Sequence, residues 1–253
     1  MIRVEGLTRR YGSTLAVVDV SFHVEAGQVL ALVGGSGAGK TTTLKMINRL
    51  VEPDAGRVVV EGKDAASVEP HALRRSIGYV FQGIGLFPHM TVAENVAMPL
   101  RLAAWERDKI GARVGELLAL VEIDPPLAGR FPASLSGGEQ QRVGVARALA
   151  ASPRVMLLDE PFGALDPLTR DRLQRSFDGL RRRLGLTAVF VTHDMAEALV
   201  LADLIGVMRA GRLVQVGTPA ELARCPADEG VASLVDAPRR QARLVASRLE
   251  GRS

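Results

Sequence analysis

The sequence has 253 residues, of which 47% are hydrophobic and 24% charged, and its 32 basic and 28 acidic residues give a net charge of +4. The basic residues are scattered, which favours solvated helix faces, such as Arg181-Arg182-Arg183, over a patch for nucleic acid or an anionic membrane. The single cysteine excludes an intrachain disulfide. The N-terminus lacks a signal-peptide pattern, and no apolar run reaches the roughly 18 residues of a membrane span. We therefore expect a soluble chain.

The first third of the chain is expected to form strands at residues 2–7, 17–24 and 57–61, where short β-branched stretches are bounded by turn residues. Residues 29–33 form a continuous apolar run, which is typical of a strand buried on both faces. This run ends at a cluster of glycines, and residues 40–50 then show a helical pattern. The order of strand, glycine loop and helix is that of a phosphate-binding unit.

The middle of the chain, about residues 83–150, is richer in Leu and Ala and is punctuated by prolines, which predicts a mostly helical insert. Later elements alternate: strands at 155–158 and 188–191, a helix at 196–202, paired strands at 205–208 and 213–216, and a short helix at 219–224. Strands that alternate with helices predict an α/β fold around a mostly parallel sheet.

A phosphate loop of the pattern G-x-x-x-x-G-K-[ST] comprises Gly34, Gly35, Ser36, Gly37, Ala38, Gly39, Lys40 and Thr41. Its glycines let backbone N–H groups approach a triphosphate, and the helix that follows points its positive end at the anion. We expect Lys40 to reach the β- and γ-phosphates of ATP, and Thr41, with Thr42 beside it, to bring a hydroxyl to Mg²⁺. The alternative, a glycine-rich turn with an incidental lysine, is disfavoured by the flanking strand and helix.

Two acidic residues follow the strand at 155–158. Asp159 is expected to enter the Mg²⁺ shell, and Glu160 to accept a proton from the water that attacks the γ-phosphate. The alternative is that both acids merely cap the strand end. His193 follows the next strand, and although a lone histidine is more often structural, ligands bind at this edge of open α/β sheets, which favours a contact with the γ-phosphate.

The segment Leu135-Ser136-Gly137-Gly138-Glu139-Gln140-Gln141-Arg142 resembles the LSGGQ-type signature of ATP-binding cassette (ABC) transporter ATPases, with Glu139 where glutamine is commoner. With the phosphate loop and the strand-borne acids, the resemblance spans about residues 2–222. It implies a P-loop NTPase (RecA-like) core with a mostly parallel sheet, an N-terminal antiparallel β subdomain and an α-helical subdomain inserted at about 83–150. In the phosphate loop, Gly35 replaces the proline often found there and leaves the liganding positions intact.

The resemblance also implies roles for single residues. Tyr11 matches the aromatic residue that stacks on adenine, and Gln82 the glutamine that senses Mg²⁺ and the γ-phosphate. Asp166, in Gly163-Ala164-Leu165-Asp166, belongs to a loop that communicates between subunits, and His193 matches the switch histidine.

The signature residues Ser136, Gly137 and Gly138 precede a helical pattern and so form a second glycine-lined helix N-terminus, which is an anion site. The resemblance implies that two copies pair head to tail, so that each presents these residues to the γ-phosphate held by the other. Hydrolysis then removes the bridging phosphate and the closed dimer is no longer favoured.

Residues 77–100 are expected to face an integral membrane permease, and they resemble the osmoprotectant-import branch of the family, whose substrates include glycine betaine, choline and carnitine; residues 84–89 carry most of this resemblance. It implies a peripheral location on the cytoplasmic face of the inner or plasma membrane, with a solute-binding protein as an indirect partner. Other small polar solutes, such as amino acids, polyamines or oxyanions, remain open.

Two other functions compete with transport for this sequence. An ABC ATPase acting on nucleic acid or ribosomes is disfavoured because the chain has one cassette and no heptad run, so no nucleic-acid partner is expected. A scaffold that binds ATP without hydrolysing it is disfavoured because Glu160 and His193 are both present. Residues 223–253 are expected to form a short helical tail without a separate regulatory domain, the alternative being a frayed terminus.

Overall fold

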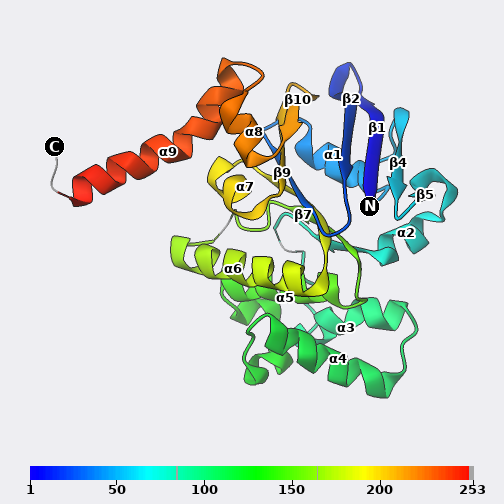
Figure 1. Ribbon diagram of the computed structural model, residues 1–253. Helices are drawn as coiled ribbons and strands as arrows, with labels where there is room; N and C mark the ends of the chain where they lie inside the picture. The colour runs from blue at the N-terminus through cyan, green and yellow to red at the C-terminus, as the bar shows by residue number, and fades with distance from the viewer. Residues whose placement is uncertain (84, 164, 251–253) are drawn as a thin grey trace.

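Two β-sheets organise the fold, and Figure 1 shows the smaller one beside the larger. The computed structural model describes residues 1–83, 85–163 and 165–250. The larger sheet has the strand order β10-β9-β3-β8-β7-β6. Its strands are β3 (Val29–Val33), β6 (Ile77–Val80), β7 (Val155–Asp159), β8 (Thr187–Thr192), β9 (Leu204–Arg209) and β10 (Arg212–Gly217).

The smaller sheet has the order β2-β1-β4-β5 and is antiparallel throughout. Its strands are β1 (Ile2–Tyr11), β2 (Thr14–Val24), β4 (Ala55–Val60) and β5 (Lys63–Asp64). In the larger sheet β6, β7, β8, β3 and β9 run parallel, and only β10 pairs in the antiparallel sense. This arrangement confirms the predicted mostly parallel core with an N-terminal antiparallel sheet. The carboxyl ends of the parallel strands therefore meet at one edge.

Helices cover both faces of the larger sheet. They are α1 (Lys40–Ile47), α2 (Pro70–Ser76), α3 (Val92–Leu102), α4 (Arg107–Leu120), α5 (Gly137–Leu149), α6 (Pro167–Leu184), α7 (Met195–Leu201), α8 (Pro219–Arg224) and α9 (Glu229–Leu249). Short 3-10 helices span Ala65–Ser67, Pro125–Gly129 and Pro132–Ser134. Helices α3, α4 and α5 gather at one end of the molecule, and we call them the helical lobe (Figure 1).

Strand β3 is buried on both faces, as its apolar run predicts. Val29, Ala31 and Val33 pack in one hydrophobic cluster with α3 to α7, whereas Leu30 and Leu32 pack in a second cluster with α1 and the antiparallel sheet. Each cluster excludes water from one side of the strand, so the end of β3 and the loop that follows it have a rigid support.

The helical lobe is seated directly on the backbone of the larger sheet. A Cβ atom at Gly78, in β6, would lie 2.6 Å from the carbonyl oxygen of Ala148, in α5. Any larger residue at position 78 would push the two elements apart. Within the lobe, Thr91 and Glu94 form a capping box at the start of α3, and the fully buried Asn95 exchanges hydrogen bonds with the backbone of Phe87.

Several elements differ from the sequence-based expectation. Strand β1 continues to Tyr11, helix α1 ends at Ile47, and α2 was not predicted. Arg181 was assigned to a solvated helix face, and this was wrong: it is 9% exposed, and its guanidinium donates to Asp178 at 2.8 Å and to Asp203 at 3.1 Å. Burial of this charge is tolerated because two carboxylates neutralise it. Arg182, by contrast, is exposed.

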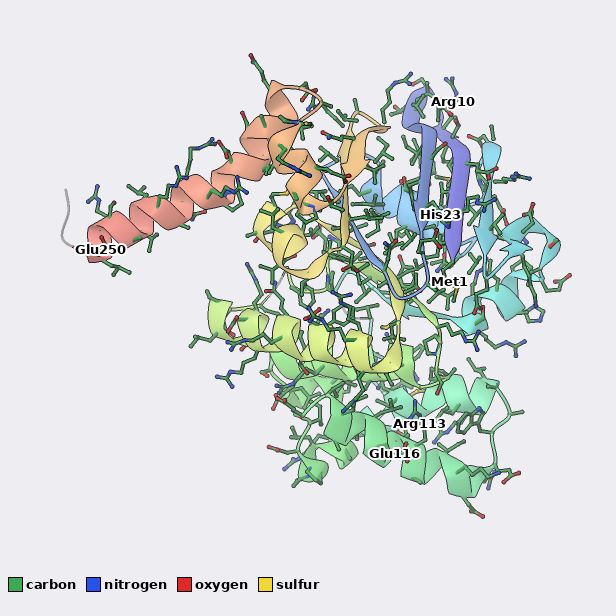
Figure 2. The ribbon with its side chains drawn as sticks, viewed as in Figure 1. Met1, Arg10, His23, Arg113, Glu116 and Glu250 are labelled. Atoms are coloured by element: carbon green, nitrogen blue, oxygen red, sulfur yellow. The ribbon has the colours of Figure 1, made fainter. Side chains whose placement is uncertain are left out.

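The tail begins with α8 and continues as α9, whose first turns pack on the molecule through the buried side chains of Val231 and Val235. The rest of α9 projects from the body, and Glu250 lies at its far end, on the opposite side of the view from Met1 (Figure 2). No helix within the described parts of the chain combines the length and apolar character needed to cross a membrane.

Candidate active site

The glycine-rich loop between β3 and α1 depends on glycine at both ends. A Cβ atom at Gly34 would lie 2.2 Å from the carbonyl oxygen of Met208, and one at Gly39 would lie 2.4 Å from that of Ala16. Gly39 also has a φ of +95°, a conformation that side chains disfavour. The tip of the loop, Gly35, Ser36 and Gly37, is exposed, whereas Ala38 is buried. The loop is therefore fixed at its base and open at its tip.

Lys40, the first residue of α1, folds back over this loop. Its Nζ donates hydrogen bonds to the carbonyl oxygens of Gly34, at 2.8 Å, and Gly35, at 2.9 Å. Burial lowers the pKa of the Lys40 ammonium, and the nearby carboxylates of Glu160 and Asp159 oppose this shift. Phosphate oxygens are stronger acceptors for an ammonium than neutral carbonyls, so the geometry of Lys40 fits a phosphate ligand.

Thr41 and Asp159 bring two oxygen atoms together beside the loop. The Thr41 hydroxyl donates a hydrogen bond of 2.8 Å to the Asp159 carboxylate, which is 2% exposed. Burial raises the pKa of Asp159, and the hydrogen bond from Thr41 opposes that rise. Mg²⁺ prefers oxygen ligands and takes few from the protein, completing its shell with water and phosphate. The pair fits such an ion, and the described residues hold no cluster of three or more His, Cys, Asp or Glu that would suggest a different metal.

Glu160 directly follows β7, so it lies at the strand end flanked by the ends of β6 and β8. Its carboxylate accepts a hydrogen bond of 3.1 Å from the Gln82 amide, which follows β6, and lies 3.5 Å from Nδ1 of His193, which follows β8. Glu160 has a φ of +48°, which is unusual for a residue with a side chain. Its backbone N–H donates a hydrogen bond of 3.0 Å to the carbonyl oxygen of Val191. Such backbone strain persists where the surroundings hold it, often at active sites. Gln82, which the family resemblance places beside Mg²⁺ and the γ-phosphate, contacts Glu160 in this structure.

The signature residues form the start of α5. The Ser136 hydroxyl accepts from the N–H of Glu139 at 3.3 Å, and the Glu139 carboxylate accepts from the N–H of Ser136 at 2.7 Å. The Ser136 hydroxyl also donates to the Glu139 carboxylate at 2.7 Å, and this bond, together with the one from the Ser136 N–H, lowers the pKa of Glu139. A Cβ at Gly137 would enter open space, whereas one at Gly138 would lie 2.5 Å from Cγ2 of Thr169 in α6. The two glycines therefore differ: Gly137 leaves the helix tip open, and Gly138 permits close packing of α5 on α6.

Asp166 caps α6 by accepting hydrogen bonds from the backbone N–H groups of Leu168 and Thr169, both at 3.1 Å. A hydrogen bond from the Thr169 side chain, followed by these backbone bonds, lowers the pKa of the Asp166 carboxyl. No hydrogen bond or ion pair among the described residues joins Asp166 or the signature residues to the phosphate loop of the same chain. Ala164 of the same loop, and Ile84 of the segment that resembles osmoprotectant importers, lie outside the described residues.

Thr42 lies partly exposed on the first turn of α1.

Tyr11 is the last residue of β1 and lies beside the turn to β2. The Tyr11 ring is 46% exposed, and the Arg9 guanidinium lies 4.9 Å from the ring centroid. An exposed ring backed by a cation can offer a face to a flat ligand. Figure 2 shows Arg10, the neighbour of Tyr11, at the end of the antiparallel sheet far from Arg113 and Glu116 in the helical lobe.

Sequence reasoning missed a second group of polar residues beside the site. The buried carboxylate of Glu197, in α7, accepts a hydrogen bond of 2.6 Å from Thr192, the residue before His193. Arg170, in α6, lies close to Glu197 and to Asp194. The sequence signals for this group were the four-residue spacing from Asp166 to Arg170, at the start of α6, and the position of Glu197 four residues after His193.

Comparison with known proteins extends these observations. A family model described as ABC transporter matches residues 17–163. The chain is 49% identical over 249 residues to the glycine betaine/carnitine/choline transport ATP-binding protein OpuCA of Bacillus subtilis (strain 168), covering 98% of this chain and 64% of that protein. It is 49% identical over 230 residues to the sulfate/thiosulfate import ATP-binding protein CysA of Bordetella parapertussis, covering 89% of this chain and 64% of that protein. The chain thus spans less than two thirds of these relatives.

A solved structure with a similar fold is the ATP-binding cassette MJ0796, captured as a dimer in a post-hydrolysis state with ADP and Pi. It superposes with a TM-score of 0.78 at 31% sequence identity, covering 86% of this chain and 98% of that chain. The likeness confirms the P-loop NTPase fold expected from the sequence. Taken with the family model and with relatives near 49% identity, it shows that the chain belongs to the ABC transporter family.

Proposed function

We propose that this protein is the ATP-hydrolysing subunit of an importer and that it works as a head-to-tail pair. The observation that carries the proposal is the meeting of Lys40, the Thr41–Asp159 pair and Glu160 at the carboxyl edge of one parallel sheet. A phosphate-binding cation, two oxygen ligands and a candidate base are the minimum set for hydrolysis of a nucleoside triphosphate.

Glu160 is the general base of this mechanism. Its carboxylate takes a proton from the attacking water, and Gln82 and His193 hold that carboxylate from two sides. The phosphate loop from Gly34 to Thr41 and the ammonium of Lys40 bind the phosphates of ATP. Mg²⁺ at Thr41 and Asp159 would neutralise charge on the β- and γ-phosphates when bound.

The site is completed by a second copy of the chain. Ser136, Gly137 and Gly138 of one copy contact the γ-phosphate held by the other, and Asp166 lies at the same interface. Two facts support this arrangement: within the described parts of the chain, no hydrogen bond or ion pair joins these residues to the phosphate loop, and MJ0796, which has the same fold, was captured as a dimer with ADP and Pi. ATP joins the pair, and hydrolysis releases it.

The permease docks on an apolar groove between β6 and the helical lobe. The groove has a volume of about 340 Å³, and its apolar lining includes Phe81, Phe87, Met98 and Leu102. Phe81 and Phe87 are 42% and 40% exposed, which is high for phenylalanine side chains. Phe81 precedes Gln82 in the chain, so movement of a docked helix would reach the Glu160 carboxylate through adjacent residues.

The imported solute is an osmoprotectant such as glycine betaine, choline or carnitine. The similarity to OpuCA, named for these three solutes, supports this choice. The similarity to CysA, named for sulfate and thiosulfate, supports the alternative that the solute is an oxyanion.

The chain lies at the cytoplasmic face of the membrane through its permease, and a solute-binding protein delivers the solute. Residues 1–222 form the ATPase domain, and residues 223–253 follow it as a short tail without a separate regulatory domain.

A hydrolysis assay tests the central proposal. The purified chain, with ATP and Mg²⁺, should release phosphate, and Lys40→Ala should abolish binding of a fluorescent ATP analogue. Lys63→Ala is the matched control, because Lys63 lies exposed on β5, away from the loop. Absence of hydrolysis by the unaltered chain, or normal ATP binding by Lys40→Ala, would refute the proposed site.

Uptake measurements test the solute. Cells that lack their own betaine and sulfate importers should accumulate labelled glycine betaine when the chain is expressed with its permease and solute-binding protein. Accumulation of sulfate instead of glycine betaine would replace the osmoprotectant assignment and leave the ATPase proposal standing.

A further inference from the structure

Arg170 lies between two loops that flank the candidate active site. It is on the first turn of α6, and its Nη2 donates a hydrogen bond of 3.2 Å to the carbonyl oxygen of Leu165. Its backbone N–H bonds to the carbonyl of Asp166 at 2.9 Å. The guanidinium is thus tied to the loop that is expected to face the second subunit.

The other side of the Arg170 guanidinium faces the segment around His193. Its Nη1 lies 3.7 Å from the Asp194 carboxylate, and its Nε lies 4.0 Å from the Glu197 carboxylate. Glu197 is 5% exposed and accepts the hydroxyl of Thr192 at 2.6 Å. The same hydroxyl accepts the N–H of Asp194 at 3.0 Å. His193 therefore sits between two neighbours that both belong to this cluster.

The Arg170 and Glu197 side chains are too far apart to form a hydrogen bond. The Nε atom is buried and has no hydrogen-bond partner within the described parts of the chain. A charged N–H···O hydrogen bond spans about 2.7–2.9 Å, so the 4.0 Å separation leaves an ion pair without a bond. An unpaired buried donor is unfavourable. A shift of about 1 Å at the Leu165 end would allow the bond to form and so favour a second arrangement.

We propose that Arg170 is a positioning residue that transmits the position of the Leu165–Asp166 loop to His193 through Glu197 and Asp194. The inference rests on the proposed function, because it assigns the loop to the subunit interface. When a second copy presses on the loop, Arg170 closes on Glu197. Thr192 and Asp194 then hold the His193 ring in the position that supports Glu160. Hydrolysis is thereby linked to the presence of the partner subunit.

The imidazole signals provide a direct test, because the chain has only four histidines, at positions 23, 71, 89 and 193. Heteronuclear NMR of the full chain, with His193 assigned by its loss in His193→Ala, should show its ring signal moving when ATP is added at dimer-forming concentrations. In Arg170→Gln the His193 signal should stay near its ATP-free position, although the nucleotide still binds. Arg172→Gln, an exposed neighbour on α6, is the matched control and should behave as the unaltered chain.

Kinetics give the second readout. Arg170→Gln should lower kcat by about tenfold, since about 1.4 kcal/mol of barrier corresponds to that factor, while ATP affinity and melting temperature stay unchanged. Glu197→Gln should have a similar effect, and the double variant should lose little more than either single one. Equal losses of affinity, stability and kcat would indicate a merely structural role and overturn the inference.

The outcomes separate this inference from the proposed function. If the unaltered chain neither binds nor hydrolyses ATP, the proposed function fails. If it does both and the His193 signal responds to ATP equally in Arg170→Gln, only the Arg170 inference fails. Should Arg170→Gln not fold, Arg170→Lys keeps the charge without the planar fork, and the same loss of the His193 response is expected.

Discussion

The amide of Gln82 donates a hydrogen bond of 3.1 Å to the carboxylate of Glu160. This bond joins the segment between β6 and the helical lobe to the residue that follows β7. On the opposite side of the same carboxylate, His193 lies at 3.5 Å. Glu160 is therefore held by residues from both flanking strands. A base that is positioned in this way is sensitive to movement of either neighbour.

Replacing Glu160 with Gln should keep ATP binding and slow phosphate release by roughly 10²–10⁴-fold, the usual contribution of a general base. Because the bridging phosphate persists, the variant should accumulate as a dimer with ATP, which size-exclusion chromatography can measure. Glu69→Gln, at an exposed position before α2, is the control and should hydrolyse normally. A strictly monomeric Glu160→Gln chain with bound ATP would contradict the proposed pairing.

Tyr11→Ala should weaken ATP binding about tenfold, because stacking of a base on an aromatic ring contributes roughly 1–3 kcal/mol. The turnover rate at saturating ATP should change little, since stacking on adenine takes no part in proton transfer to Glu160. Tyr11→Phe keeps the aromatic face and should bind normally. Titration with a fluorescent ATP analogue gives all three affinities, and an unchanged affinity in Tyr11→Ala would remove this residue from the adenine site.

The two signature glycines should respond differently to alanine. A Cβ at Gly138 meets Thr169 at 2.5 Å, so Gly138→Ala should destabilise the chain by roughly 1–3 kcal/mol, the range for overpacking. Gly137→Ala adds a methyl group in open space and should fold normally while lowering ATPase activity, because the methyl group would meet the partner's phosphate. Denaturant melts and ATPase assays on both variants separate the two roles. Normal activity in Gly137→Ala would count against a phosphate contact at that helix tip.

The first turn of α9 should be sensitive to acid. Two hydrogen bonds from Arg209, with a further one from the Val231 N–H, lower the pKa of Asp228 from its usual 3.8 to about 2. A lowered carboxyl pKa stabilises the folded state above pH 3.8, and this stabilisation is lost as the pH falls toward 2.

Asp228→Asn should therefore lower the urea midpoint at pH 7, and its difference from the unaltered chain should shrink progressively below pH 3.8. Asp236→Asn, farther along α9 with a looser contact to Arg240 at 3.7 Å, is the control and should have a smaller effect. A difference between Asp228→Asn and the unaltered chain that does not change with pH would exclude ionisation of Asp228 as the cause.

The parts of the fold that sequence reasoning predicted are those with strong local signals. The apolar runs that became β3 and β7 are buried on both faces and lead directly into the phosphate loop and Asp159, so pattern and chemistry agree there. The start of α6 also had signals, Asp166 as a cap and Pro167 at the first helical position, yet its bounds were not predicted. The charged composition of this helix, including the buried Arg181, obscured its apolar positions.

The contacts within the site could not be predicted from the sequence in the same way. The family resemblance identified Gln82, and positions at strand ends identified Glu160 and His193, but the meeting of the three depends on strand order and on the positive φ of Glu160. The Arg170–Glu197 pair was missed because neither residue belongs to a short motif. Its partners come together only when α6 and α7 pack beside the same strand end.

The contact between Gly78 and Ala148 has a mechanical consequence. Since the carbonyl of Ala148 lies against the backbone of β6 at Gly78, with the ring of Pro153 beside it, the two elements have little room to slide, and we expect the helical lobe to turn as a rigid body about this contact. The groove proposed for the permease is lined by both residues of this contact, Gly78 and Ala148, and Gln82 follows Gly78 by four residues in the chain. A small push from the membrane partner would then be converted into a displacement at the water-activating carboxylate, without any rearrangement inside the lobe.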